Sequence, residues 1–270
     1  MMSTDKPEKI GVIGAGVMGE ALISALIASG VMPGSISISE KRKDRADELV
    51  ARYGVIHRDL ATNVGQSDAL LLVVKPQDMA AVLDEIKSLI RAQTLVISFA
   101  AGKKIEFVSA RLGGVNPVVR VMPNTPALVG EGMAAISVGS GVSPAQSQFV
   151  QDFLGATGRV VVVAEELQDA VTAVSGSGPA YFFYFVESMI KGGVELGLSN
   201  DLATELTIQT IVGAAKLLAT SEKSATTLRE NVTSPNGVTA VAIASFDSAD
   251  LPAIVRNGMF AARDRSEELA

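Results

Sequence analysis

The segment Asn231–Thr239, NVTSPNGVT, has the composition of an anion-binding turn that opens onto a helix. Residues 235–237, Pro-Asn-Gly, favour a turn, and the apolar residues that follow have helical spacing. The first backbone N–H groups of that helix would therefore converge near Val238 and Thr239, where the Thr239 hydroxyl adds a polar group. The same residues would also suit an ordinary helix cap, so both interpretations stay open.

A glycine motif near the N-terminus is typical of dinucleotide-binding proteins. It runs Gly14-Ala15-Gly16-Val17-Met18-Gly19, follows the β-type run at 9–13 and precedes apolar residues at helical spacing. In the fingerprint, the first glycine makes a tight turn, the second lets the pyrophosphate approach, and the third allows close helix–strand packing. The alternative is a glycine turn of a related fold that binds no ligand.

The residues at the end of the second predicted strand carry conflicting signals about the cofactor. Ribose specificity is normally set about 20 residues beyond the glycines. Ser39, Lys41 and Arg42 could hold a 2′-phosphate, whereas Glu40 could accept hydrogen bonds from a free 2′-hydroxyl and repel a phosphate. A basic cluster at a helix start is also often plain solvated surface.

Three further turns follow predicted strands, at Val73–Gln77, Ser98–Gly102 and Arg120–Met133. The carboxyl ends of strands form the ligand edge of a doubly wound sheet, so these turns favour a wall on the nicotinamide side. A small-residue segment at 175–180, SGSGPA, precedes an aromatic run. We expect it to be a rigid turn that positions a helix beside the cofactor, with a flexible hinge as the alternative.

Strand-type and helix-type segments alternate in the first part of the chain, which predicts an α/β fold with a doubly wound parallel sheet. The predicted strands are Lys9–Ile13, Ser35–Ser39, Ala69–Val74, Leu95–Phe99, Val118–Met122, Ala134–Val138 and Val160–Val163. After residue 164 the spacing is helical throughout. We therefore expect a dinucleotide-binding domain at 1–164 and an all-helical domain at 165–270, which is apolar enough to need a partner surface and to form at least a dimer.

Composition excludes several classes of protein. The 270 residues are 48% hydrophobic with a formal net charge of −6, which argues against nucleic acid or an anionic membrane as a partner and favours a small molecule. The chain has no cysteine, which excludes thiolate chemistry and suits a reducing cytoplasm. The single histidine, His57, excludes a His-rich metal site, and we expect no metal; His57 itself is expected at a strand end or in a loop. Glycines and Glu20 interrupt the apolar stretch at 10–31, so no signal peptide or membrane span is expected.

Taken in order and spacing, GAGVMG, VVKPQ, RVMPNTPALVGEGM, SGSGPAY and NVTSPNGVT resemble the pyrroline-5-carboxylate reductases, over nearly the whole chain. The segment VTSPNGVTAVAIASFD is the most specific, with Asn236 in place of a more usual glycine. The resemblance implies an oxidoreductase that reduces 1-pyrroline-5-carboxylate to L-proline in the last step of proline biosynthesis, with NADPH as the cofactor and NADH as the alternative. It also implies a homodimer built through the helical domain, often assembled into larger rings such as decamers, with the substrate loop at the dimer contact.

The resemblance assigns roles to individual residues. Thr239 would contact the imine nitrogen, Gly237 and Val238 would hold the substrate carboxylate by backbone N–H groups, and Asn231 would support the loop. Glu222 matches a glutamate that could hold a proton or a water, and Glu165 matches a position near the bound amino acid. The cofactor side would comprise Ile13, Gly14, Ala15, Gly16, Val17, Met18, Ser39, Glu40, Lys41, Arg42, Val73, Val74, Lys75, Pro76, Phe99, Ala100 and Ala101. Glu40 departs from the family pattern, which leaves the choice between NADPH and NADH open.

Two other functions are compatible with parts of the chain. The β-hydroxyacid dehydrogenases share this plan but use a lysine followed four residues later by asparagine. Here Lys216 is followed by Thr220, and Lys191 by Glu195, so that catalytic pair is missing. A nucleotide-sensing protein without turnover would keep the glycine motif, although the intact turn at Thr239 counts against it.

Overall fold

A computed structural model describes residues 6–269 and divides the chain into two compact units. The first extends as far as Ser177 and takes in the chain again from Ala262, and the second is Gly178–Ala261. The first unit is α/β and the second is entirely helical, which confirms the predicted fold class. The compact units divide later than the predicted boundary after residue 164, which therefore stays a prediction for the functional domains.

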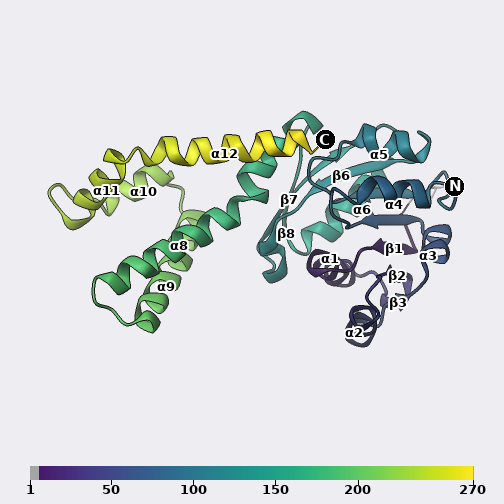
Figure 1. Ribbon diagram of the computed structural model, residues 1–270, viewed down its shortest axis with the longest axis horizontal. Coiled ribbons are helices and arrows are strands. Elements are labelled where there is room, and N and C mark those ends of the chain that lie inside the picture. Colours follow the sequence, from purple (N-terminus) through teal and green to yellow (C-terminus); the bar gives the residue numbers. More distant parts are fainter. Residues whose placement is uncertain (1–5, 270) are drawn as a thin grey trace. The chain divides into compact units, whose positions relative to one another are not determined.

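The first unit is built on one eight-stranded sheet with the order β3-β2-β1-β4-β5-β6-β7-β8 (Figure 1). Its strands are β1 Ile10–Ile13, β2 Ile36–Ser39, β3 Ile56–His57, β4 Ala69–Leu72, β5 Leu95–Ser98, β6 Val118–Met122, β7 Gly132–Val138 and β8 Gly158–Val162. The first six have the order of a dinucleotide-binding sheet. His57 is the last residue of β3, at a strand end as expected.

One strand corrects the prediction of a parallel sheet, because β7 pairs antiparallel to β6. Every other pair of neighbouring strands is parallel. The segment between Met122 and Gly132 is shorter than the dozen or so residues that a parallel crossover needs. The chain therefore turns back on itself there.

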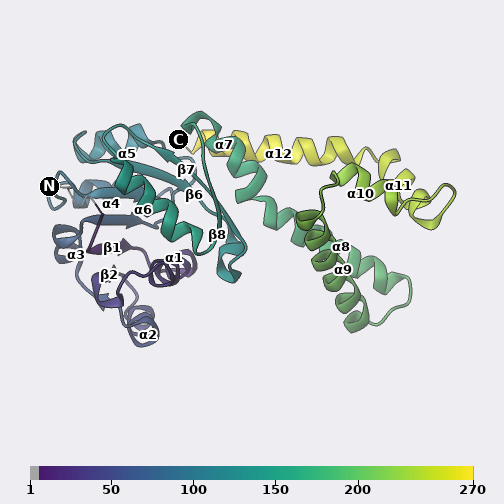
Figure 2. The same cartoon turned by 180° about the vertical axis from the view of Figure 1, so that it is seen from behind.

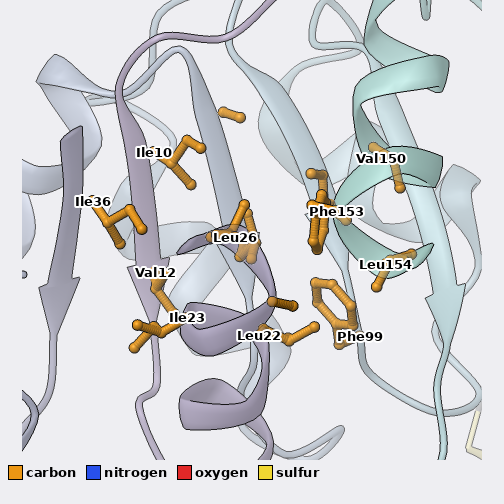
Figure 3. Packing of buried hydrophobic residues seen from close by; sticks show 14 of the residues in the cluster. Ile10, Val12, Leu22, Ile23, Leu26, Ile36, Phe99, Val150, Phe153 and Leu154 are labelled. Atoms are coloured by element: carbon orange, nitrogen blue, oxygen red, sulfur yellow. The ribbon is translucent and has the colours of Figure 1, made fainter. Parts of the chain in front are cut away.

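Helices cover both faces of this sheet. They are α1 Val17–Ala28, α2 Lys43–Tyr53, α3 Leu60–Gln66, α4 Met79–Ile86, α5 Ile105–Leu112, α6 Pro144–Gly155 and α7 Gln168–Val171, with 3₁₀ turns at Pro33–Ser35, Thr125–Val129 and Glu165–Leu167. Side chains of α1, α2 and α6 pack into one core cluster, and those of α3, α4 and α5 into another. Figure 3 shows part of the first cluster, in which Leu26 of α1 lies between Ile10 of β1 and Phe153 of α6. The uninterrupted apolar strands β1, β4 and β5 are buried on both faces, as their sequences predict.

The second unit consists of helices with little interior of their own. They are α8 Gly178–Glu195, α9 Asn200–Thr220, α10 Ala225–Asn231, α11 Val238–Ser248 and α12 Leu251–Glu268, the last of which ends in the first unit. Figures 1 and 2 both show α8 and α9 side by side, and Gly193 permits this because an added β-carbon would lie 3.1 Å from the Ala203 side chain. Large apolar side chains remain exposed on every helix of this unit except α10. By length and composition alone, α9 could cross a membrane, and so could α11 and α12 as a bent pair.

The small-residue segment at 175–180 differs from the expected turn. Thr172–Gly176 forms one π-helical turn that leads almost directly into α8. An added β-carbon at Gly176 would lie 2.4 Å from Cε of Met122, so the end of the Met122 side chain would have to shift to admit one. The Asn124 side chain donates to the carbonyl oxygen of Ser175 at 3.1 Å and so ties this turn to the loop after β6. The segment is thus a helical distortion packed on the sheet unit.

Candidate functional site

The three glycines of the motif have the geometry that each role in the fingerprint requires. Gly14 has φ +87°, and an added β-carbon would lie 2.6 Å from the carbonyl oxygen of Val73. At Gly19 an added β-carbon would lie 2.4 Å from the carbonyl oxygen of Gly14, so this contact between helix and turn admits only glycine. Gly16 faces open space, with no atom within 4 Å of an added β-carbon. A phosphate group has room to approach the backbone there.

The start of α1 completes an anion site at this open position. Gly16 is the N-cap residue, and no side chain caps the helix, so its first N–H groups are available to a ligand. Ile13 and Ala15 are buried and offer only backbone atoms, whereas Val17 is exposed. These residues fit a dinucleotide whose pyrophosphate lies at the N-terminus of α1.

Two side chains at the end of β2 are held by hydrogen bonds, and one of them contacts the glycine turn. The Glu40 carboxylate accepts hydrogen bonds from the backbone N–H groups of Ala15 and Arg42, both at 3.0 Å. Its side chain is only 12% exposed. The Ser39 hydroxyl donates to the carbonyl oxygen of Arg58 at 3.1 Å and accepts from Nδ2 of the buried Asn63 at 2.9 Å. Glu40 and Ser39 are therefore fixed by the fold.

An ion network behind the glycine turn was not among the predicted site residues. Nε of Arg45 donates to the carbonyl oxygen of Ala15 at 3.1 Å, and its guanidinium also pairs with Glu20 of α1. Arg52 and the Tyr53 hydroxyl donate to the same carboxylate. Burial acts to raise the pKa of Glu20, but the hydrogen bonds from Arg45, Tyr53 and Arg52 together bring it below its ordinary value. The sequence shows Glu20 in the first turn of α1, but a single sequence does not indicate that this carboxylate contacts side chains of α2.

The two exposed cations beside Glu40 lie on the surface. Lys41 and Arg42 both follow β2, and the Arg42 side chain is 63% exposed, with Nε 3.9 Å from a Glu40 oxygen. Their contact with a cofactor stays a prediction.

The other predicted cofactor segments lie at the same edge of the sheet. The Val73 N–H donates to the carbonyl oxygen of Ile13 at 2.9 Å, and the Phe99 N–H donates to that of Leu72 at 3.1 Å. The turns after β1, β4 and β5 are thus adjacent. The side chains of Phe99 and Ala100 belong to the core clusters, so these residues offer a ligand only backbone atoms. Val74, Lys75, Pro76 and Ala101 are at least partly exposed there.

In the second unit, the turn at 232–237 opens onto a helix as the sequence predicts. Asn231 ends α10, Gly237 is the N-cap residue of α11, and no side chain caps that helix. Asn236 has φ +59°, a left-handed conformation that asparagine tolerates better than most residues, and Gly237 could not carry a β-carbon without approaching Ser234 Oγ to 2.5 Å. Val238 is 92% exposed and Thr239 is exposed beside it. The N–H groups and the hydroxyl are therefore open to a ligand.

The two glutamates differ in their surroundings. Glu222 is exposed in the turn after α9, and no hydrogen bond or ion pair to its carboxylate is found among the described side chains. Glu165 accepts a hydrogen bond from the Ile105 N–H at the start of α5, at 2.7 Å, and lies 3.4 Å from the guanidinium of Arg120. It also borders a shallow hollow of about 600 Å³ between α5 and β7. In this unit Glu165 acts as a helix cap, and its contact with substrate stays a prediction.

A buried cation was missed by the sequence analysis. Arg120 of β6 is 3% exposed and lies 3.2 Å from Asp169 Oδ1, which also accepts a hydrogen bond from the Ser266 hydroxyl at the end of α12. This chain of contacts joins the sheet to the last residues of the first unit. No local pattern in the sequence indicates a contact between residues so far apart.

Comparison with known proteins identifies the family of this chain. A family model described as pyrroline-5-carboxylate reductase dimerisation matches residues 165–269, and one described as NADP oxidoreductase, coenzyme F420-dependent, matches residues 9–102. A pyrroline-5-carboxylate reductase of Corynebacterium melassecola is 40% identical over 264 residues, which is 96% of this chain and 98% of the relative. The chain belongs to the pyrroline-5-carboxylate reductase family.

Two further members extend the likeness. The pyrroline-5-carboxylate reductase of Pseudomonas aeruginosa is 40% identical and is matched over 97% of each chain. The crystal structure of the Plasmodium falciparum pyrroline carboxylate reductase, which has NADP bound, superposes with a TM-score of 0.88 at 30% identity, covering 97% of each chain. The dimerisation model covers all the exposed helices of the second unit, so this pyrroline-5-carboxylate reductase family member forms a homo-oligomer.

Proposed function

We propose that this protein reduces 1-pyrroline-5-carboxylate to L-proline by hydride transfer from NAD(P)H, as the last step of proline biosynthesis. The observation that carries the proposal is that each unit has an open helix N-terminus, and that the two differ in their chemistry. One follows the glycine turn at Gly16, and the other begins at Val238 beside the Thr239 hydroxyl. The first suits a pyrophosphate and the second a small carboxylate.

The reaction needs little acid–base chemistry from the protein. The bound nicotinamide nucleotide supplies the hydride. The protonated imine accepts that hydride at carbon, so that the C=N double bond becomes a single bond and the nitrogen keeps its proton. The amine then takes up a proton from solvent. A site that orients the imine and hydrogen-bonds its nitrogen is therefore sufficient.

Within the substrate turn we assign the residues as follows. The N–H groups at Gly237 and Val238 hold the carboxylate, and the Thr239 hydroxyl accepts a hydrogen bond from the iminium nitrogen. Asn231, at the end of α10, supports the loop. Glu222 holds a proton or a water, and Glu165 lies near the bound amino acid. Glu222 is exposed in the monomer, as this role requires.

We propose a homodimer built through the helical unit, assembled further into a ring such as a decamer, in the cytoplasm. The exposed apolar side chains of α8 and α9 support this assembly, because few of them are covered within one chain. The same surface explains why α9 is apolar enough for a membrane span, and we propose that another copy covers it instead of lipid. No nucleic-acid partner is expected at a net charge of −6. Light scattering during size-exclusion chromatography tests the assembly, and a monomer that binds detergent would contradict it.

The test of the activity is loss of absorbance at 340 nm with purified protein and 1-pyrroline-5-carboxylate, run with NADPH and with NADH. Turnover with formation of L-proline is expected with at least one nucleotide. Folded, oligomeric protein that binds a nucleotide but turns over with neither would overturn the proposal in favour of a nucleotide-sensing protein.

A further inference from the structure

We infer that Glu40 makes this enzyme prefer NADH to NADPH by occupying the place of the 2′-phosphate with a fixed negative charge. The inference rests on the proposed use of a nicotinamide nucleotide but not on the imine reaction. It starts from the position of Glu40 directly after β2, where dinucleotide-binding sheets read the adenosine ribose.

The carboxylate is held in place from two sides. One oxygen accepts from the Ala15 N–H within the glycine turn, and the other accepts from the Arg42 N–H at the start of α2. Swinging the side chain away would leave both N–H groups without this partner, at a site where Glu40 is only 12% exposed. The negative charge of Glu40 therefore stays at the position where a 2′-phosphate would bind. The carboxylate and the phosphate would repel each other there.

The donors that would bind a 2′-phosphate are already engaged. The Ser39 hydroxyl gives its only proton to the carbonyl oxygen of Arg58, and the Arg42 N–H is held by Glu40 itself. A free 2′-hydroxyl, by contrast, can donate to a carboxylate oxygen, because each oxygen has a second lone pair.

Two of the nearby arginines are engaged by other side chains. The Arg45 guanidinium binds Glu20 and Glu48, and the Arg58 guanidinium donates to Gln66 Oε1 at 2.8 Å. The cations that follow Glu40 directly are exposed: Lys43 pairs with Asp47, and Arg42 Nε lies 3.9 Å from a Glu40 oxygen. The attraction of Lys41 and Arg42 for a phosphate is screened by salt at this surface.

The experiment measures nucleotide binding without substrate. The chain has no tryptophan, so the fluorescence of the reduced nicotinamide can be followed directly, and calorimetry with ADP-ribose and 2′-phospho-ADP-ribose separates the adenosine end from the nicotinamide. For the natural chain, Kd for NADPH is expected to exceed Kd for NADH by at least about tenfold, the effect of one like charge beside the 2′-phosphate. Equal or tighter binding of NADPH would overturn the inference.

Two variants separate charge from position. Glu40→Gln removes the charge and keeps the length of the side chain, and Glu40→Ser removes the charge and shortens the side chain. Each is expected to shift the ratio of the two Kd values toward NADPH by at least about tenfold. Asp44→Ser is the matched control, because Asp44 is an exposed acid in the first turn of α2. It is expected to leave the ratio unchanged. If Glu40→Gln has the same ratio of Kd values as the natural chain, or if Asp44→Ser shifts the ratio equally, Glu40 does not have this role. A natural chain that binds the two nucleotides in the expected ratio but has no turnover would count only against the proposed reaction.

Discussion

Gly19 in the first turn of α1 faces the carbonyl oxygen of Gly14 so closely that an added β-carbon would lie 2.4 Å from it. This contact brings the helix against the turn that precedes it. It fixes where the first N–H groups of α1 point, and so fixes the anion site itself.

Alanine substitutions at Gly19 and Gly16 are expected to affect different properties of the protein. Gly19→Ala forces backbone atoms apart, so we expect a melting midpoint lower by several degrees together with weaker NADH binding. Gly16→Ala meets open space within the protein, so we expect an unchanged melting midpoint but a Kd for NADH raised at least about tenfold by contact with the pyrophosphate. Calorimetric melting and nucleotide fluorescence measure the two effects. Tight binding by Gly16→Ala would show that the pyrophosphate lies elsewhere.

Thr239→Val is expected to lower kcat by roughly ten- to a thousandfold, the range for removing one preorganised polar group, with the fold retained. The methyl group replaces the hydroxyl at nearly the same volume on an exposed helix start. Thr239→Ser, which keeps the hydroxyl, should stay within a few-fold of the natural chain. If steady-state assays give equal kcat for Thr239→Val, the hydroxyl does not contact the imine.

Asp68 gives a prediction about acid stability. Burial acts to raise its pKa, but the Lys9 N–H, the Arg91 guanidinium and the Glu8 N–H donate to the carboxylate and bring the pKa below its ordinary value of 3.8. A lowered pKa in the folded state adds stability above pH 3.8, and this is lost as the pH falls through the folded value. Asp68→Asn should therefore destabilise the protein at pH 7, and its stability should approach that of the natural chain as the pH falls through the lowered pKa of Asp68. Denaturant titrations across this range test it, and a constant difference would exclude linkage to this carboxylate.

Phe183 lies on α8 with 68% of its surface exposed in the single chain. If the helical unit forms the subunit contact, Phe183→Asp places a charge in an apolar interface and should shift the protein toward monomers in sedimentation velocity. Val115 is the control, because it is an apolar residue of the sheet unit that is 63% exposed. Val115→Asp should sediment like the natural chain, and equal behaviour of the two variants would place the contact elsewhere.

The sequence predicted best where a local pattern reports a local geometry. Strands Leu95–Ser98 and Val118–Met122, helix Ile105–Leu112 and the start of the helix at Val238 all follow from apolar spacing and turn residues. Gly54 follows the last residue of α2 with φ +70°, the left-handed conformation that glycine favours at a helix end.

What could not be predicted depends on contacts between distant residues. The reversal of β7 arises from connection length, and the π-helical turn at Thr172–Gly176 depends on packing against Met122. Helices α3, α6 and α10 were missed, as short or weakly patterned segments often are. In the site, the pairing of Glu40 with Ala15 spans 25 residues and has no signature in the sequence.

The end of α12 has a consequence for the order in which the protein is made. Residues 262–269 belong to the sheet unit, and the Ser266 hydroxyl reaches Asp169 there. The ribosome therefore delivers the whole helical unit, with its exposed apolar side chains, before the sheet unit receives its last piece. A nascent chain must therefore carry that apolar surface until residues 262–269 complete the sheet unit.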